Sequence, residues 1–465
     1  MLSVKANLLA SRGHEVSIVV LRLKGRKPFF PIDPSVNIVD LSAPYLSLPG
    51  HPSSANATSD SPRSTVSSAV GSTSVPSTES ASTESSASNP ASCSAIMESI
   101  ASPVSLAVGS TSSPAPGSAR TENIASSPAS CSARMEGNAS GPATMASERL
   151  KGSVRKRMSR VVEMLDPDVC VSLCGPEVRI LPAVAGGRPC VAEYHFSHDK
   201  FYRKYGGIFM YPYAWLRTHM LERAVSEYDC MVTLTEHDLP IWKRHCRRVE
   251  RIFNPVTTPP GQVSRLAEKR MIAVGRLEDQ KNFKDLVSAW SIVAERCPDW
   301  RLEIFGEGKL EHALRSQIAR LGLTGSVILR GVVKDIASEY SNSSALLMTS
   351  LHEGFPLALV EASSFGLPLI SYDCPTGPSE IIIDAGAGDG AGNVPAATLD
   401  QATGNTPNGY LVPVGDVRTL ADRICRIASD DNLRLRLGAA SKASSRRFTP
   451  ETIISAWEHL FFSLL

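Results

Sequence analysis

The sequence predicts an α/β protein made of two doubly wound, largely parallel sheets. Apolar runs of strand length alternate with helix-length segments from residue 168 onwards, and 465 residues suffice for two ordinary domains. A third observation is a long Ser-rich stretch in the first half, whose composition differs from that of the rest of the chain. We interpret it as an insert in the first domain.

The first unit is expected to begin with the end of a helix over residues 4–11, which Gly13 would terminate. The apolar run that follows predicts a buried strand over 15–21. Beyond the insert, similar runs predict three further strands, over 168–173, 190–194 and 229–234.

The second unit shows a clearer alternation. Strands are expected at 271–274, 301–305, 326–329, 345–348 and 367–372. Helices are expected from residue 282, after residue 308, and over 336–341, 420–429 and 452–462. Ligands of open α/β sheets bind beyond the carboxyl ends of the strands, so functional residues are expected in the loops that follow each strand.

Residues 52–148 are predicted to be disordered. Ser occupies 30 of the 98 positions from 51 to 148, and no Phe, Trp or Tyr occurs there. Such a segment cannot bury enough apolar surface to offset its ordering entropy. Residues 68–99 also match 106–137 at 21 of 32 positions, as in an expanded low-complexity repeat. The alternative is a modified or adhesive stalk.

Charge and cysteine usage narrow the classes of function. A net charge of +2 implies no general field for polyanions, so no nucleic acid partner is expected. The ten cysteines form no paired Cys-x2-Cys motifs, and Cys170 and Cys174 are expected to be two buried thiols on one strand. Scattered thiols, and the lack of a leader or spanning segment, predict a cytoplasmic location. The basic segment 149–160 is either a solvated helix face or a site of attraction to anionic lipid on the inner face of the membrane or to a lipid diphosphate acceptor.

The most informative motif holds two carboxylates, Glu353 and Glu361, eight residues apart. Pro356 favours a first helical turn, which puts Glu353 just before a helix and Glu361 inside it. Upstream, Arg276 and Lys281 share one short loop after an expected strand, where they are either a solvated surface pair or cations converging on a diphosphate. Downstream come the segments 373–382 and 408–412.

These four elements, in this order, resemble glycosyltransferase family 4, of retaining type with a Glu-x7-Glu motif, as in bacterial polysaccharide and glycan assembly. The resemblance implies a GT-B fold: two Rossmann-like domains facing a cleft, over 1–253 and 254–448, with 449–465 returning to the first. Asn254-Pro255-Val256 resembles the family's hinge. The family's first strand and Gly-rich loop have no counterpart before the 4–11 helix, which implies that the 15–21 strand lacks one neighbour.

The resemblance also implies roles for individual residues. Glu353, His195, Arg276 and Lys281 would be catalytic, with Glu353 at the transferred sugar and Glu361 at the ribose. His195 follows a strand, where a structural histidine is equally common, and His198 competes for its role. The donor would further contact Gly275, Gly306, Gly308, Gly354, Phe355, Pro356 and Leu357, although a turn explains Gly306-Glu307-Gly308 equally well. Thr376 and Gly377 would border the acceptor, and for Glu380 a simple helix-start carboxylate is the alternative to any role in the site.

The function expected from this pattern is transfer of a hexosyl or N-acetylhexosaminyl unit from a UDP-linked donor to a glycan or lipid-linked acceptor. No metal site and no cofactor are expected, because no Asp-x-Asp follows a strand end in a suitable setting. The alternative is a non-catalytic nucleotide-sugar-binding remnant. Two further alternatives are a phosphorylase or synthase of the same architecture, and a protein whose Ser-rich repeats are the functional part.

Overall fold

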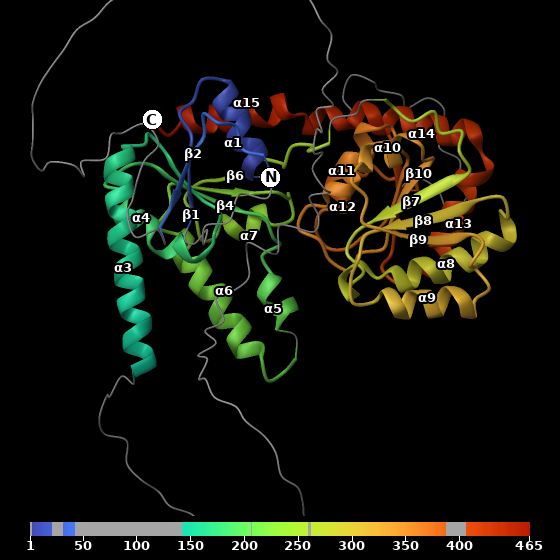
Figure 1. Cartoon of the computed structure of the whole chain (residues 1–465), viewed down its shortest axis with the longest axis horizontal. Helices are drawn as coiled ribbons and strands as arrows, with labels where there is room; N and C mark the ends of the chain where they lie inside the picture. Colours follow the sequence, from blue (N-terminus) through green and yellow to red (C-terminus); the bar gives the residue numbers. More distant parts are fainter. Residues whose placement is uncertain (1, 21–30, 42–141, 206, 259–261, 387–405) are drawn as a thin grey trace, which may run out of the picture.

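The computed structural model describes residues 2–20, 31–41, 142–205, 207–258, 262–386 and 406–465. These residues form three parallel sheets with helices packed around them, which confirms the predicted α/β class (Figure 1). The predicted disorder of the insert lies outside the described residues, except at its end.

The six-stranded sheet forms the C-terminal half and has the order β12-β11-β10-β7-β8-β9. Each of its strands is followed by a loop that turns into a helix, as expected of a doubly wound sheet. Its strands are β7 (Arg270–Val274), β8 (Arg301–Phe305), β9 (Val327–Gly331), β10 (Ala345–Met348), β11 (Leu369–Tyr372) and β12 (Gly409–Val412). Its helices are α8 (Phe283–Arg296), α9 (Glu311–Arg320), α10 (Ile336–Ser341), α11 (Leu357–Ser364), α12 (Pro378–Ile381), α13 (Val417–Ser429) and α14 (Asp431–Ser444), with the 3-10 turns η3 (Asp279–Lys281) and η4 (Ser445–Phe448).

Both faces of this sheet are buried, because alternate side chains of each strand point to opposite faces. In β7, Met271 and Ala273 join the core shared with α8, α9 and α13. Ile272 and Val274 join the opposite core, shared with α10 and α11. The near-continuous apolar runs that predicted these strands follow from this double burial.

The four-stranded sheet of the N-terminal half has the order β3-β4-β5-β6. Its strands are β3 (Cys170–Ser172), β4 (Cys190–Tyr194), β5 (Cys230–Thr233) and β6 (Val249–Arg251). The helical elements of this half are α3 (Pro142–Leu165), η2 (Pro176–Arg179), α4 (Leu181–Val184), α5 (Lys200–Lys204), α6 (Tyr211–Val225) and α7 (Leu239–Trp242). One face of the sheet shares a core with α3, α6 and α7. The other face is covered by the C-terminal helix α15 (Pro450–Phe462), whose Ile453, Trp457 and Leu460 pack on β4 and β5.

A separate two-stranded sheet joins β1 (Ser17–Val20) to β2 (Asn37–Asp40) in parallel. Within the described residues, β1 therefore has one strand neighbour, β2. The preceding helix α1 (Leu2–Ser11) packs against α15, with Arg12 and Glu458 paired at 2.9 Å.

Two details of the sequence interpretation are wrong. Helix α3 begins at Pro142, so residues 142–148 are helical although the sequence placed them in the disordered insert. Cys174 lies beyond the end of β3 with φ +55°, so it does not share a strand with Cys170, which instead pairs in register with Cys190 of β4. The strands β2, β6 and β12 were not predicted as strands, and the residues of β12 were expected only as part of the 408–412 motif.

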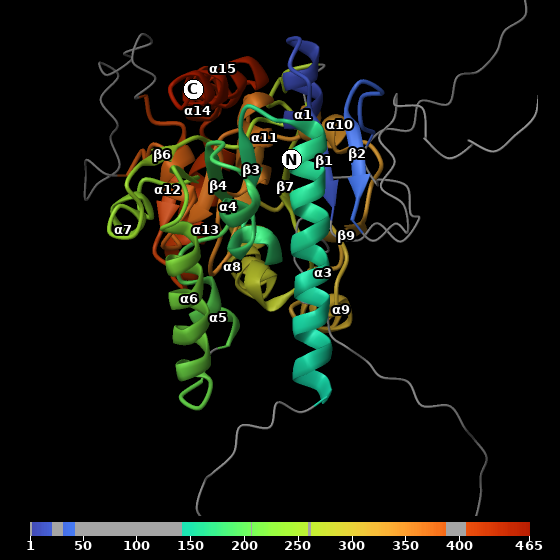
Figure 2. The same ribbon diagram turned by 90° about the vertical axis from the view of Figure 1, so that its left-hand side faces the viewer.

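The two halves meet through an aromatic cluster and the segment after β6. Phe253 stacks on Phe355 with ring centres 5.3 Å apart, and Phe448 packs edge-on against both rings. The Val256 amide donates to the Phe448 carbonyl at 2.8 Å. In two views, α3 and the α5–α6 pair project in the same direction from the N-terminal half (Figures 1 and 2).

Candidate functional site

The loops after β7 and β10 are held together at the carboxyl ends of these strands. The Leu351 amide donates to the Gln280 carbonyl, and the Gln280 side chain donates to the His352 carbonyl, at 2.8 and 2.9 Å. This arrangement brings Lys281 Nζ within 2.7 Å of Glu353 Oε1, with both side chains nearly buried. Two residues that the sequence analysis assigned to catalysis therefore form one ion pair.

The loop that follows Glu353 lies directly against the N-terminal half. A Cβ atom built on Gly354 would lie 2.5 Å from the His195 carbonyl oxygen and 3.2 Å from the Phe196 Cα atom. Only glycine fits such a close backbone approach without displacement. The structure thus brings the segment around His195 and the loop around Glu353 into contact across the two halves.

The loop after β11 closes over the same segment. Gly377 has φ +99°, and a Cβ there would lie 2.5 Å from Pro356 Cδ and 3.2 Å from the Gly354 carbonyl oxygen. The Thr376 hydroxyl donates to the Glu353 carbonyl. Thr376 and Gly377 therefore position the Glu353–Pro356 loop by direct contact.

His195 follows β4 and belongs to a buried cluster of charged and polar side chains. Its Nε2 lies 3.3 Å from Glu193 Oε1, its Nδ1 lies 3.5 Å from the Asn254 amide, and Glu193 also pairs with Lys5 of α1. Burial raises the pKa of Glu193, but the charges of Lys5 and His195 outweigh this and hold that pKa well below its usual value. Glu193 is thus a fixed carboxylate that orients the imidazole.

Glu361 lies inside α11 with 3% of its surface exposed. Its carboxylate accepts hydrogen bonds from three hydroxyl groups: Thr257 at 2.6 Å, Tyr340 at 3.1 Å and Thr258 at 3.4 Å. Burial raises the pKa of Glu361, and these hydroxyl donors lower it in part. The environment therefore presents a desolvated carboxylate to hydroxyl donors.

The loop with Arg276 packs tightly on the loop after β8. A Cβ on Gly306, which has φ +134°, would lie 2.0 Å from the Gly275 carbonyl oxygen, and one on Gly308 would lie 2.5 Å from that of Leu277. The close packing of the two loops therefore explains why glycine occupies both positions. Arg276 is largely buried, and its guanidinium pairs with Glu278 of the same loop at 3.0 Å. This ion pair is separate from the one between Lys281 and Glu353.

Two other predicted residues point elsewhere. His198 contacts Glu222 at 2.9 Å rather than Glu193. Glu380 lies at the start of α12 and joins the two halves, since its carboxylate accepts from the Glu236 amide at 2.6 Å and from Arg251 at 3.2 Å.

Sequence reasoning missed five residues that surround the candidate site, namely Lys5, Glu193, Thr257, Thr258 and Tyr340. Thr257 and Thr258 follow the hinge-like Asn254-Pro255-Val256, which was the available signal. Tyr340 and Lys5 are distant in sequence from the residues they contact, and no local pattern marks them.

The comparisons with known proteins point to one class of enzyme. Residues 259–444 match the family model described as glycosyl transferases group 1. An uncharacterized glycosyltransferase of Haemophilus influenzae is 27% identical over 50% of this chain and 62% of its own length. An amylovoran biosynthesis glycosyltransferase of Erwinia amylovora is 30% identical over 42% of this chain and 48% of its own length. The chain thus spans less than two thirds of either relative.

Solved structures show the fold. Sucrose-phosphate synthase of Thermosynechococcus elongatus superposes with a TM-score of 0.58 at 13% identity, over 99% of this chain and 91% of that one. The S. aureus protein TarM, in complex with fondaparinux, α-GlcNAc-glycerol and UDP, gives 0.52 at 19% identity over 66% of this chain and 59% of its own. The fold is GT-B, as predicted, and the matches support the GT-B glycosyltransferase superfamily.

Proposed function

We propose that the chain is a retaining, family 4 glycosyltransferase that moves a hexosyl or N-acetylhexosaminyl unit from a UDP-linked donor to a glycan or lipid-linked acceptor. The observation that supports this best is the Lys281–Glu353 pair at 2.7 Å. Gly354 of the same loop packs against the backbone of His195, so the cation and carboxylate of one half lie next to the segment that carries an imidazole of the other half.

The donor would bind to the C-terminal half. Arg276 and Lys281 would neutralise the departing diphosphate, since fixed cations in a water-poor site stabilise developing charge strongly. Gly275, Gly354, Phe355, Pro356 and Leu357 would line the donor, with Gly306 and Gly308 beside the base. UDP in the TarM complex supports a uridine nucleotide.

Glu361 would bind the ribose. Its present partners, Thr257, Thr258 and Tyr340, are all hydroxyl donors, as the ribose diol is. We propose that the two ribose hydroxyls take the positions of the threonine hydroxyls when the donor binds, so that the carboxylate keeps its hydrogen bonds in both states.

The transfer would break the bond between the sugar C1 and the diphosphate oxygen and form a bond between C1 and an acceptor oxygen on the same face. Attack from the same face would retain the configuration at C1, and the acceptor proton would pass to the departing phosphate oxygen, which balances the charge. Glu353, fixed by Lys281, would orient the sugar, and His195, fixed by Glu193, would hydrogen-bond it from the other half.

The acceptor would enter beside Thr376 and Gly377. A relative that is named for amylovoran biosynthesis supports a glycan acceptor. None of the described helices is long and apolar enough to cross a bilayer. We propose a cytoplasmic location with peripheral contact at the inner face of the membrane.

Two features support the membrane contact. Helix α3 exposes Arg155, Lys156 and Arg160. The hairpin tip, residues 207–217, exposes apolar side chains, with Ile208 at 86%, Phe209 at 95% and Trp215 at 52%. Exposed apolar side chains that insert and exposed basic side chains that attract anionic lipid are both typical of proteins that bind anionic membranes. Both elements project to the same side (Figure 2).

The test is a transfer assay with the purified full chain, a panel of UDP-hexoses and membrane lipid extract. We expect release of UDP with one donor and a product whose anomeric configuration matches the donor. Lys281→Ala should slow transfer on the order of 100-fold. Lys284→Ala, which removes an exposed lysine one turn away, should not. Mg²⁺ or Mn²⁺ added after chelation should not raise the rate.

Three outcomes would contradict the proposal. Binding of UDP-sugars without turnover would favour the non-catalytic remnant, and inversion at C1 would exclude the retaining mechanism. Equal rates for the Lys281→Ala and Lys284→Ala variants would show that another charge stabilises the leaving group.

A further inference from the structure

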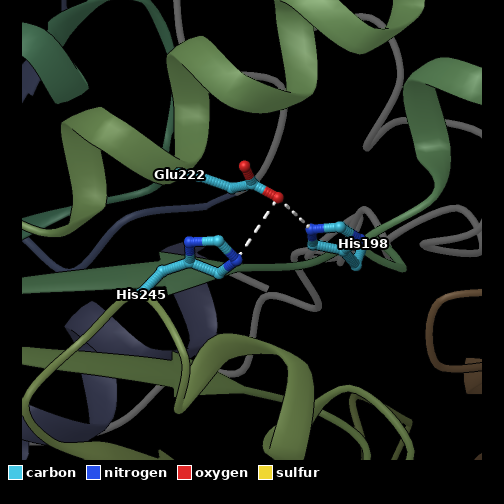
Figure 3. Close-up of side chains that lie close together, drawn as sticks. All are labelled: His198, Glu222 and His245. Carbon is cyan, nitrogen blue, oxygen red and sulfur yellow. Dashed lines mark hydrogen bonds and ion pairs between the residues drawn. The ribbon is translucent and has the colours of Figure 1, made fainter.

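Two histidines and a glutamate meet on the N-terminal half, separate from the residues assigned to sugar transfer. Glu222 Oε1 lies 2.9 Å from His198 Nε2 and 3.4 Å from His245 Nε2 (Figure 3). These three ligand atoms all lie within 4.8 Å of one another. His198 comes from the loop after β4, Glu222 from α6 and His245 from the segment after α7.

The three side chains are held in place by their surroundings. The His198 ring packs edge-on against the buried Trp242 ring, with centres 5.0 Å apart. The backbone amide of His245 donates to the Trp242 carbonyl at 2.9 Å. The two imidazole rings are nearly parallel, with an interplanar angle of 15°. Trp242 thus fixes both histidines so that their Nε2 atoms face the same carboxylate oxygen.

The separations suit a small divalent ion. Zn²⁺ binds imidazole nitrogen and carboxylate oxygen at about 2.0–2.2 Å, which in a tetrahedron separates neighbouring ligand atoms by roughly 3.3–3.5 Å. The contact of Glu222 Oε1 with His245, at 3.4 Å, falls in that range, and the contact with His198, at 2.9 Å, is slightly shorter. The other oxygen, Oε2, lies 3.5 Å from Nδ1 of His219, which would act as an outer partner of the ligating carboxylate.

We propose that His198, Glu222 and His245 bind Zn²⁺, with a fourth position open to water. The donor set, two imidazoles and one carboxylate, is one that Zn²⁺ uses in proteins. The ion would join α6 to the loops after β4 and α7. His198 is three residues from His195, so this metal would stabilise the segment that positions His195. It would not replace Arg276 and Lys281 at the leaving group.

The test is calorimetric titration of ZnCl₂ into the purified, chelator-treated full chain. We expect one zinc ion per chain, and a Kd that rises more than about tenfold in His245→Ala and in Glu222→Gln. The control is His237→Ala, since His237 is an exposed histidine of the same half whose ring pairs with Asp238 at 3.3 Å. Zinc should also raise the Tm of the wild type and of the control, but not that of the two site variants.

A spectroscopic readout separates a metal site from a set of hydrogen bonds, and a folding control accompanies it. Co²⁺ bound in place of zinc should give the visible absorption of a low-coordinate N/O site, and this absorption should vanish in Glu222→Gln. Circular dichroism of each variant would establish that it folds, and Glu222→Gln preserves side-chain size. Wild-type protein that binds no zinc, or zinc affinities equal in all four proteins, would overturn the proposal.

Discussion

The Glu361 carboxylate is buried in α11 and holds three hydroxyl donors, and this environment makes it a sensitive probe of the proposed donor site. We predict that Glu361→Ala weakens UDP binding by about 1–3 kcal/mol, the scale for hydrogen bonds to a charged group. Calorimetric titration with UDP would measure this loss of affinity. Glu295→Ala, which removes an exposed carboxylate of α8, is the control. Unchanged UDP affinity in Glu361→Ala would exclude contact with the ribose.

The raised pKa of Glu361 also predicts a dependence of stability on pH. Because burial raises the folded-state pKa above the unfolded value of about 4.3, the folded protein binds the extra proton more tightly. This stabilising effect is complete below the unfolded pKa and is lost as the pH rises through the folded one.

Glu361→Gln removes this titration while it keeps the shape of the side chain. We therefore expect the Tm of the wild type to fall relative to that of Glu361→Gln as the pH is raised from about 4 to neutral. Thermal melts of both proteins across that range would measure the difference. A difference that stays constant, or that grows in the opposite direction, would contradict the raised pKa.

At the scale of elements, the loop with Arg276 packs against Gly306 and Gly308 of the loop after β8. Gly306→Ala would force a Cβ to within 2.0 Å of the Gly275 carbonyl oxygen at a φ of +134°. Gly322 also has positive φ, +70°, but a Cβ added there would meet no atom within 4 Å. The two substitutions therefore separate backbone strain from steric overlap.

We predict that Gly322→Ala costs about 1–2 kcal/mol of unfolding free energy, the usual cost of left-handed backbone. Gly306→Ala should cost about 4 kcal/mol or more, because the overlap adds to the strain. Urea unfolding of both variants would measure these values. Equal costs would show that the loop after β8 relaxes freely, and the packing role of Gly306 would then be wrong.

The exposed apolar side chains of the hairpin tip, residues 207–217, allow a test of the proposed membrane contact. Phe209→Glu should weaken sedimentation with anionic lipid vesicles roughly tenfold or more, since burial of one such side chain is worth about 1.5–3 kcal/mol. Phe462→Glu, at an exposed phenylalanine of α15, is the matched control. Equal binding by both variants, or equal binding to zwitterionic vesicles, would contradict an anionic membrane contact through the tip.

The sequence predicts most strands of the large buried sheet, but it misses short or polar strands and the start of α3. Strands such as β7 and β10 are predictable because both faces are buried, which makes them continuous apolar runs. In contrast, β2 has polar residues, Asn37 and Asp40, at both ends. The start of α3 was missed because its first turns belong to the Ser-rich composition of the insert.

The candidate site shows the same limit. The loops with Arg276, Lys281 and Glu353 are recognisable because each role lies in a short local motif. The contact of Gly354 with His195 requires the tertiary fold, since the two residues come from different halves. His198, Glu222 and His245 are more than twenty residues apart along the chain, so no spacing rule for metal ligands marks them.

At the scale of the whole molecule, the halves differ in how firmly their sheets are supported. The six-stranded sheet lies between two large cores, one on each face. Among the described residues, the β1–β2 sheet has a small core of Ala6, Ile18 and Val36 with a few partly buried neighbours, and it reaches the larger core of the N-terminal half through Val39 of β2. Two-stranded sheets are marginally stable unless other elements cover them.

We therefore predict that the amides of β1 and β2 exchange with deuterium faster than those of β7, β8 and β10. In β1, one edge pairs with β2 and the other has no strand partner among the described residues, whereas β7, β8 and β10 are paired on both sides. Strand β3 belongs to a four-stranded sheet but, among the residues that the structure describes, pairs with β4 alone, so it is the internal control and should be intermediate. Mass spectrometry of peptides from each strand would measure the rates. Equal protection of β1 and β7 would mean that a further segment of the chain, or a partner, pairs with β1 in solution.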